Sequence, residues 1–510
     1  MPESLRALVV ILVLALPTMA WAQSAMSTPT MNRPAHGPGY WQLWLTVTLF
    51  AFTIPSLALF LVFVSLFLMA FVVKKPNPMA QFMVLILAIP SVWFVVPAFG
   101  LIDHLAEFDF VRLVILVFLV PAFFLLGNDP ADGRAGRLWV LLFLGWLFAL
   151  TFMATNFTTF LRTVFQTLLD VLVPFEIGRR SVRRIDDLQR ISTAFVTVAA
   201  GLSLIAIFEY SRHWLLYASL PAWWGTTWGL GHYLDRGGAL RAQATMGQPI
   251  NLGYVLAIAF VLALPRSQYG GRPRRRLPML ILIAGGLFAS LSRGPWLGAI
   301  AGCLIYLALK PKAARTLLIT LFLGAFTIVV LPLVPGGEKI YNLLPFVGKS
   351  DVGSETYRHD LLLGFWDLLV ANPITGVPDY DTRPELQYLR QGEGIIDLVN
   401  TYLGVAVGSG FPGLLLFIFA HSVVLFGLWR SLKRFSAEGR DLASAFLAAY
   451  LAAMLIIATT SSIGPIATVY WSFAGIASGL IMLANKDRVV VRRRPASRVQ
   501  LVADPATNPH

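Results

Sequence analysis

Apolar runs of about 17 to 25 residues, separated by short polar or basic stretches, recur along nearly the whole chain. Runs of this length can cross a lipid bilayer as helices. The predicted spans are 6–22, 48–73, 80–102, 111–127, 138–157, 159–178, 191–210, 249–265, 277–292, 295–309, 316–334, 401–428, 442–461 and 464–484. The pattern therefore predicts an all-α polytopic membrane protein with about 13–14 transmembrane helices.

The first apolar run has two interpretations. Arg6, a short apolar region and the small residues Ala20 and Ala22 before Gln23 are typical of a signal peptide, but an uncleaved anchor has the same pattern. Residues 1–23 are thus a signal-peptide-like segment or the first span. In both cases residues 24–45 are expected outside the cytoplasm, ahead of an N-terminal transmembrane bundle within 24–210.

Composition and charge support this class of protein. Apolar residues make up 57% of the chain and charged residues only 13%, which is out of range for a soluble protein of 510 residues. The net charge of +14 comes largely from basic clusters between the apolar runs. Such clusters mark cytoplasmic connections by the positive-inside rule, so we read them as a topology signal and not as a nucleic-acid surface. With Cys303 as the only cysteine, neither an intrachain disulfide nor a thiolate metal cluster is expected, and no metal or cofactor is predicted.

The charge pattern divides the second half of the chain. Two long segments, 211–248 and 335–399, are predicted to be periplasmic loops. They flank central spans within 249–334 and precede C-terminal spans within 400–485 and a basic cytoplasmic tail, 486–510. In the second loop, Ser354 is a candidate cap for a helix that ends at Asn372-Pro373. Its apolar face would comprise Tyr357, Leu361, Leu362, Phe365, Leu368 and Leu369.

Arginines lie near the starts of spans that run from outside to inside. Arg241 comes shortly before the span that begins at Pro249, Arg293 precedes Gly294-Pro295 at the start of another, and Asn400-Thr401 begins a third. Each start presents unpaired backbone N–H groups and the positive end of a helix dipole to the outer face. Arginine grips phosphate in a bidentate manner, so the pattern predicts an anion site. The plainer alternative is that each arginine reaches toward lipid headgroups.

Four passages carry a resemblance to a known family. They are Leu240-Arg241-Ala242-Gln243-Ala244-Thr245-Met246-Gly247-Gln248-Pro249-Ile250-Asn251, Leu291-Ser292-Arg293-Gly294-Pro295-Trp296, Tyr357-Arg358 with Asn372-Pro373-Ile374-Thr375-Gly376-Val377, and Val399-Asn400-Thr401-Tyr402-Leu403 with Gly408, Gly410 and Pro412. In order and topology they resemble the O-antigen ligase and Wzy-type polysaccharide polymerase superfamily of bacterial inner membranes.

The resemblance implies a metal-independent glycosyltransferase without cofactor. It would move a glycan from undecaprenyl diphosphate to a glycan or lipid acceptor at the periplasmic face, with a chain-length regulator as a further partner. Arg241, Arg293, Arg358 and Asn400 would then bind the diphosphate, where arginines stabilise the charge of the leaving group.

One position departs from the family. Many members have His-Asn where this chain has Val399-Asn400, and a valine cannot accept a proton. Asp397 and Glu393 are the nearest carboxylates that could act as base, with Asp397 preferred; it could equally cap a local turn or pair with Arg390. Because the histidine is most associated with ligases, its absence favours polymerisation of exopolysaccharide or O-antigen repeat units over ligation to lipid A core.

Functions of other classes remain alternatives. A flippase for lipid-linked sugars, or another polysaccharide transporter, should carry charges near the middle of its spans and often has repeated halves. The chain shows neither pattern clearly. A non-catalytic scaffold of an export complex is the third alternative, because the family histidine is missing.

Overall fold

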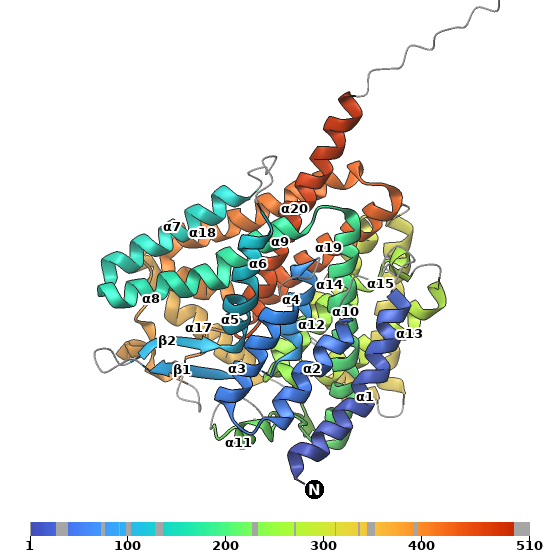
Figure 1. The fold of residues 1–510 in the computed structure, drawn as a ribbon, viewed down its shortest axis with the longest axis horizontal. Helices are drawn as coiled ribbons and strands as arrows, with labels where there is room; N and C mark the ends of the chain where they lie inside the picture. Colours follow the sequence, from blue (N-terminus) through green and yellow to red (C-terminus); the bar gives the residue numbers. More distant parts are fainter. Residues whose placement is uncertain are drawn as a thin grey trace, which may run out of the picture.

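The computed structural model describes residues 2–26, 39–72, 77–90, 92–97, 104–127, 136–226, 233–269, 272–311, 313–334, 337–343, 352–390 and 396–493. Helices dominate these residues (Figure 1). Those of the first half are α1 (Glu3–Met26), α2 (Tyr40–Thr53), α3 (Leu57–Phe67), α4 (Pro78–Ala88), α5 (Phe110–Val114), α6 (Val120–Leu125), α7 (Arg137–Ala154), α8 (Phe157–Thr167), α9 (Val173–Ser181) and α10 (Ile185–Arg212). Single π-helical stretches extend α3 (Leu68–Val72), join α5 to α6 (Ile115–Leu119) and join α8 to α9 (Leu168–Leu172).

The second half of the chain continues the bundle. Its helices are α11 (Leu220–Trp223), α12 (Pro249–Leu262), α13 (Arg276–Ala289), α14 (Arg293–Ala308), α15 (Ala313–Val330), α16 (Gly337–Leu343), α17 (Val352–Ala371), α18 (Thr401–Ser431), α19 (Ala437–Ile456) and α20 (Ile466–Arg493). Two short antiparallel hairpins pair β1 (Trp93–Pro97) with β2 (His104–Asp109) and β3 (Asp235–Arg236) with β4 (Ala239–Leu240).

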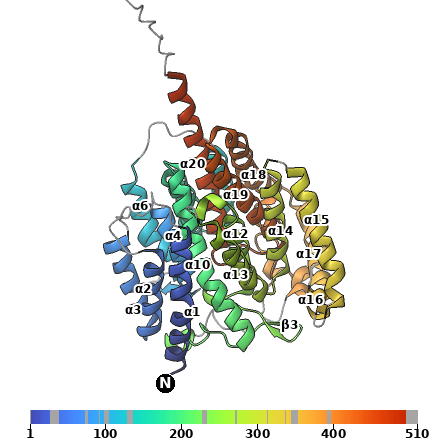
Figure 2. The ribbon, with the colours of Figure 1, turned by 90° about the vertical axis from the view of Figure 1, so that its right-hand side faces the viewer.

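The structure confirms an all-α polytopic membrane protein. Within the described residues, seven helices are long and apolar enough to cross a membrane: α1, α7, α10, α15, α18, α19 and α20. Shorter apolar helices, such as α4 and α12, pack among them. In Figure 2, α1, α10, α12 and α13 run side by side, with the end of α20 at the top and β3 at the bottom.

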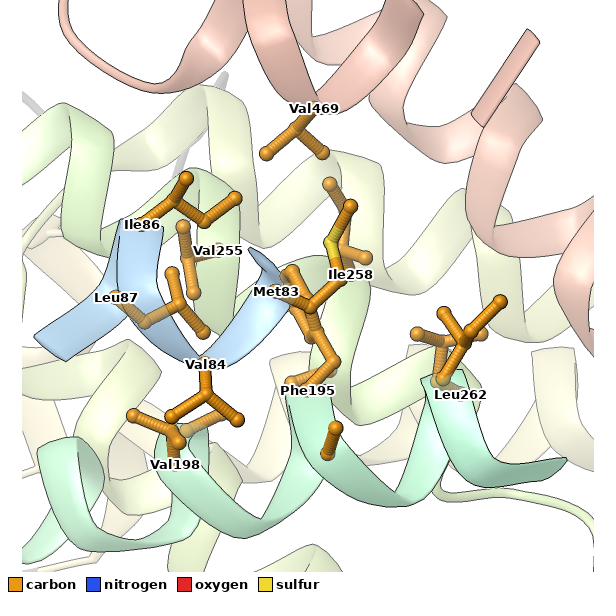
Figure 3. Close-up of a cluster of buried hydrophobic side chains, with 14 of the residues drawn as sticks. Met83, Val84, Ile86, Leu87, Phe195, Val198, Val255, Ile258, Leu262 and Val469 are labelled. Carbon is orange, nitrogen blue, oxygen red and sulfur yellow. The ribbon is translucent and has the colours of Figure 1, made fainter. Parts of the chain in front are cut away.

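The core lies around α10 and α12. Figure 3 shows side chains from α4, α10 and α12 meeting there, and Phe195, Val255 and Ile258 are completely buried. A helix that is apolar on all sides requires either protein or lipid around it. In α15, in contrast to α10 and α12, no residue is buried against protein. The bundle therefore has an inner set of helices and an outer set that faces lipid.

Two predicted spans are interrupted, each at an Ile-Pro pair. The segment 48–73 is split between α2 and α3 at Pro55, and 80–102 ends as a helix before Pro90 and continues into β1. Both preceding residues are extended, Ile54 at φ −94° and ψ 113° and Ile89 at φ −98° and ψ 126°. A proline ring disfavours the helical conformation in the residue before it, so both predictions of a single continuous span were wrong.

The extra crossing at α2 reverses the expected direction of α1. Backbone and side-chain oxygens of Ser24 accept hydrogen bonds from Arg272 (2.9 Å) and Arg275 (3.0 Å), which belong to a predicted cytoplasmic cluster. At the other end of α1, the guanidinium of Arg6 lies 5.8 Å from the ring centroid of Trp214, in a predicted outer loop. The start of the 24–45 segment thus lies at the arginine-rich end of the bundle, contrary to expectation; residues 27–38 lie outside the described residues.

Charged groups between helices are paired. Arg112 makes a bidentate bridge to Asp170, with Nε 3.0 Å and Nη2 2.8 Å from carboxylate oxygens. Buried Glu176 in α9 lies within 3.3 Å of three guanidinium groups, those of Arg137, Arg179 and Arg180. A buried charge requires such partners, and these bridges tie α5 to the α8–α9 unit and α7 to α9.

Candidate active site

The candidate site lies where α12, α14 and α18 begin, at the end of the bundle opposite the arginine clusters. Strained backbone precedes each start: Ala244, Leu291 and Val399 have positive φ of 46°, 47° and 43°. Such values are uncommon for residues other than glycine and outlying for a β-branched valine. Each lies within or beside one of the passages singled out from the sequence. Strain of this kind persists only where surrounding contacts impose it.

Two arginines hold the turn before α14. Arg241 donates from Nε to the carbonyl of Ser290 (3.4 Å) and from Nη2 to the hydroxyl of Ser292 (3.1 Å). Arg236, in β3, donates to the carbonyl of Leu291 (2.6 Å). Since Ser292 directly precedes Arg293, three arginines lie at one helix start: Arg241 and Arg293 from two of the passages, and Arg236 from β3. Sequence reasoning missed Arg236, whose only signal was its place in the same outer loop as Arg241.

Arg293 is the first residue of α14. Its Nη2 lies 3.5 Å from the carbonyl oxygen of Asn342 in α16. The first turn of α14 adds backbone N–H groups and the positive end of the helix dipole to the guanidinium charge. This combination is suited to an anion such as diphosphate.

Asp397 is held in one orientation just before α18. One carboxylate oxygen accepts from the backbone N–H of Val399 (3.1 Å) and from the hydroxyl of Ser461. The hydroxyl of Tyr357 donates to the carbonyl of Asp397 (3.0 Å). Burial and the nearby charge of Asp397 raise the pKa of Tyr357, so that its hydroxyl stays protonated as a donor. The other carboxyl candidate, Glu393, lies outside the described residues.

Asn400 is the N-cap of α18. Its side-chain oxygen accepts from the N–H groups of Tyr402 (2.9 Å) and Leu403 (3.2 Å). This satisfies two donors of the first turn and defines where the helix begins. A role for Asn400 in binding diphosphate stays a prediction.

The segment Thr459–Pro465, which we call the hub loop, contacts all three helix starts. Thr401 of α18 donates to the carbonyl of Thr460 (2.8 Å), and its hydroxyl lies 2.9 Å from that of Ser462. A Cβ placed on Gly294 of α14 would lie 2.2 Å from the Thr459 hydroxyl, and one on Gly464 would lie 2.8 Å from Asn251 of α12. The loop was missed from sequence, although its Thr-Thr-Ser-Ser run between two apolar spans was a signal.

Glu209, at the end of α10, binds the backbone of the passage 240–251, which contains Arg241. This fully buried carboxylate accepts from the backbone N–H groups of Leu216 (3.0 Å), Gln243 (2.9 Å) and Ala244 (2.9 Å). Three charge-assisted hydrogen bonds anchor the backbone in which Ala244 adopts its positive φ. A carboxylate at the end of an apolar run gave no hint of this role in the sequence.

Arg358 lies apart from the other two candidate arginines. It is exposed on α17, next to Tyr357, and no contact among the described residues joins it to Arg241 or Arg293. Its neighbour His359 is also exposed, with its Nδ1 3.8 Å from Asp360. The helix itself is confirmed, although it begins at Val352, upstream of the expected cap.

The third and fourth passages meet inside α18. Gly410 interrupts this helix with φ 69° and ψ −178°. The chain after α17 fills the break: Val377 donates to the carbonyl of Val407 (2.6 Å), and Phe411 donates to that of Pro373 (2.9 Å). The indole of Trp146, in α7, donates to the carbonyl of Ser409 (2.8 Å). Backbone groups that the interruption would leave unpaired are thus satisfied by residues distant in sequence.

Among the residues that the structure describes, no cluster of three or more His, Cys, Asp or Glu side chains is placed to hold a metal ion. The fold and site together define a multi-pass membrane protein with an arginine-lined helix start and a fixed carboxylate at one end of its bundle. Residues 278–418 match the sequence model of the O-antigen ligase family. These residues are therefore similar to the O-antigen ligase family, and the match confirms the predicted resemblance to the O-antigen ligase and Wzy superfamily.

The match begins in α13 and ends in α18, so it includes Arg293, Arg358 and Asp397 but neither Arg241 nor the hub loop. No curated protein matches the chain significantly. The match supports, in general terms, a function in glycan assembly on lipid-linked substrates within a bilayer.

Proposed function

We propose that the protein polymerises exopolysaccharide or O-antigen repeat units carried on undecaprenyl diphosphate, at the periplasmic face of the bacterial inner membrane. The observation that carries the proposal is the convergence of Arg241 on Ser292, immediately before Arg293. Arg241 is thereby held beside the start of α14, where Arg293 adds a second guanidinium group and the first turn adds backbone N–H groups. That arrangement suits a diphosphate leaving group and supplies positive charge without a metal.

In the proposed reaction, a hydroxyl oxygen of the acceptor glycan attacks the anomeric carbon of the donor. The bond from that carbon to the diphosphate oxygen breaks, and its electron pair leaves with undecaprenyl diphosphate. Arg241 and Arg293 stabilise the negative charge that develops there. The hydroxyl proton passes to the carboxylate of Asp397, which Ser461 and the Val399 N–H hold in place.

The test is a transfer assay with purified protein and lipid-linked repeat units, measuring released undecaprenyl diphosphate and glycan chain length. Arg293→Ala should lower the rate by about a hundredfold or more, since a preorganised donor to the developing charge is lost. Arg383→Ala is the matched control, because Arg383 pairs with Asp379 on an exposed surface (3.1 Å). Undiminished polymer after Arg293→Ala would rule the proposal out.

The base is tested separately by Asp397→Asn, which keeps the shape of the side chain. Loss of transfer with retained donor binding supports Asp397 as proton acceptor. Wild-type activity would remove it from that role while leaving the arginines unaffected.

Ligation is the second candidate, favoured by the description of the matching family. The same assay separates the two reactions. Products longer than one repeat unit, formed from lipid-linked repeats alone, indicate polymerisation. Product that appears only when lipid A core is added indicates ligation.

A further inference from the structure

A hollow lined by basic side chains lies between α9 and α20, and we call it the basic hollow. Arg179 and Arg180 in the last turn of α9, Arg183 just beyond it and Lys486 of α20 contribute to its lining. Both α6 and α20 pack against α9, and the three helices lie together where the end of α20 leaves the bundle (Figure 1). Since α20 begins directly after the hub loop, the basic hollow and the candidate active site lie at opposite ends of the bundle.

Lys486 marks one boundary of the membrane. The part of α20 that qualifies as a span is Ile466–Lys486, which has 21 residues. At 1.5 Å per residue it is about 31 Å long, and the apolar layer of a bilayer is about 30 Å thick. A span of this length has little to spare, so its two ends lie close to the two membrane surfaces. The basic hollow therefore lies at the level of the lipid headgroups.

One buried carboxylate behind the basic hollow is shared by three arginines. Glu176 lies 2.8 Å from Arg137 of α7, 2.7 Å from Arg179 and 3.3 Å from Arg180. Within α9 the spacing of three and four residues places Arg179 and Arg180 on the same face as Glu176. A single negative charge cannot neutralise three guanidinium groups, so this cluster retains positive charge.

Two further basic side chains, those of Arg183 and Lys486, are exposed at the basic hollow. Arg183 donates from Nη2 to the carbonyl of Leu126 (2.7 Å), which holds it beside the end of α6. The carboxylate of Asp187 is also near, and it caps α10 by accepting from the backbone N–H of Arg183 (3.1 Å). One such carboxylate leaves the excess of positive charge in place, and an excess of one sign attracts ligands of the other.

Exposed apolar side chains lie directly beside the basic hollow. Gly127 contributes to its lining, and the residues shortly before it expose Phe124 (77%) and Leu125 (66%). The guanidinium of Arg180 lies 4.1 Å from the ring centroid of Phe123, whose ring is 5.5 Å from that of Phe124. The charged and apolar surfaces are thus continuous. A free phosphate would contact the charged part alone, whereas a phospholipid would contact both.

We propose that the basic hollow binds the headgroup phosphate of an anionic phospholipid, with the acyl chains against Phe124 and Leu125. Arg183 and Lys486 contact the phosphate oxygens. Arg179 and Arg180, held by Glu176, supply positive charge behind them. Basic pockets between membrane helices suit anionic headgroups, and the guanidinium fork matches phosphate geometry. The proposal does not rest on the glycan transfer reaction, whose candidate site is at the other end of the bundle.

The test is native mass spectrometry of the purified full-length protein in a mild detergent, titrated with phosphatidylglycerol, because this method counts each bound lipid. The variants are Arg183→Gln and Lys486→Gln, singly and together; both side chains are exposed, so folding should be unaffected. Arg274→Gln is the matched control, an exposed arginine at the same end of the bundle, in the turn before α13. Phosphatidylcholine, which has no net charge, and glycerol 3-phosphate, which has no acyl chains, are the comparison ligands.

Each single variant should weaken binding of the first phosphatidylglycerol molecule by about fivefold, and the double variant by about twenty-five-fold, since one basic group near a membrane surface contributes about 1 kcal/mol. Arg274→Gln should bind it as the wild type does, and phosphatidylcholine should bind weakly to every variant. Equal affinity of the wild type and the double variant for phosphatidylglycerol would overturn the proposal. Glycerol 3-phosphate binding as tightly as phosphatidylglycerol, and lost in the same variants, would show a site for free phosphate and overturn it equally.

Discussion

The hydroxyl of Ser461, in the hub loop, donates a hydrogen bond to the carboxylate of Asp397, which precedes α18. The same carboxylate oxygen accepts from the backbone N–H of Val399 (3.1 Å). A side chain held by two donors points its remaining oxygen in one direction, as a base aimed at an acceptor hydroxyl requires. We therefore regard Ser461 as a positioning residue for Asp397.

Ser461→Ala should lower transfer by about ten- to hundredfold, because a misplaced base loses most of its effect. The loss should appear in kcat, with little change in donor KM or in thermal stability. Ser461→Thr, which retains the hydroxyl, should restore activity. If Ser461→Ala lowers activity further in an Asp397→Asn background, the two residues act independently and the positioning role is wrong.

The break in α18 predicts opposite effects on stability when alanine replaces Gly410 and when it replaces Gly408. Gly410 has φ 69° and ψ −178°, a region accessible essentially to glycine alone, and a Cβ there would lie 2.1 Å from the carbonyl oxygen of Ile374. Gly410→Ala should destabilise the protein by about 1–3 kcal/mol from backbone strain alone, with the collision in addition.

Gly408→Ala is the matched control, two positions earlier in the same helix. A Cβ at Gly408 meets nothing within 4 Å, and alanine is favoured over glycine in a helix by about 0.5–1 kcal/mol. Thermal unfolding in detergent should show a lower Tm for Gly410→Ala and an equal or higher Tm for Gly408→Ala. Equal Tm values for both variants would argue against the interrupted helix.

The all-helical membrane class could be predicted from the sequence because membrane spans depend on local length and apolarity. The two misjudged spans contained their own signal, Pro55 and Pro90, which the continuous apolar runs outweighed. Proline acts through the backbone of the preceding residue, so hydropathy alone does not register it. Missing the break at Pro55 also reversed the predicted direction of α1.

The candidate site was predictable only in part. Arg241, Arg293 and Asp397 could be proposed because each lies beside a helix start or in a recognisable passage. Arg236, Glu209 and Ser461 could not, since their roles depend on contacts with residues far away along the chain. Glu209 in particular reads as an ordinary polar residue at the end of a span, and only its three backbone partners reveal its function.

Glu209→Gln tests that function. The amide keeps the size of the carboxylate but replaces one acceptor oxygen with an N–H₂ donor, which would face backbone N–H groups of Leu216 or of Gln243 and Ala244. Unpaired buried donors and the lost charge-assisted bonds should lower the free energy of unfolding by about 3 kcal/mol. Denaturation of purified protein measures the loss, and Glu385→Gln, on an exposed turn, should be neutral. Unchanged stability would mean that the Arg241 passage does not depend on Glu209.

The contact between α14 and the hub loop can be tested by two substitutions, the second of which should compensate for the first. A Cβ at Gly294 would lie 2.2 Å from the Thr459 hydroxyl, too close for any unstrained packing, so Gly294→Ala should displace the start of α14 and with it Arg293. Transfer should fall by about tenfold or more, because arginine placement governs stabilisation of the leaving group.

Thr459→Ala removes the hydroxyl and leaves only the Thr459 Cβ, 3.3 Å from the added methyl group, a distance that small shifts can relieve. Gly294→Ala combined with Thr459→Ala should therefore recover most of the activity, whereas Thr459→Ala alone should have little effect. A double variant as impaired as Gly294→Ala would show that the collision lies elsewhere. Recovery would establish that the hub loop sets the position of the arginine at the start of α14, since among the described residues outside α14 only Thr459 lies within 4 Å of the added methyl.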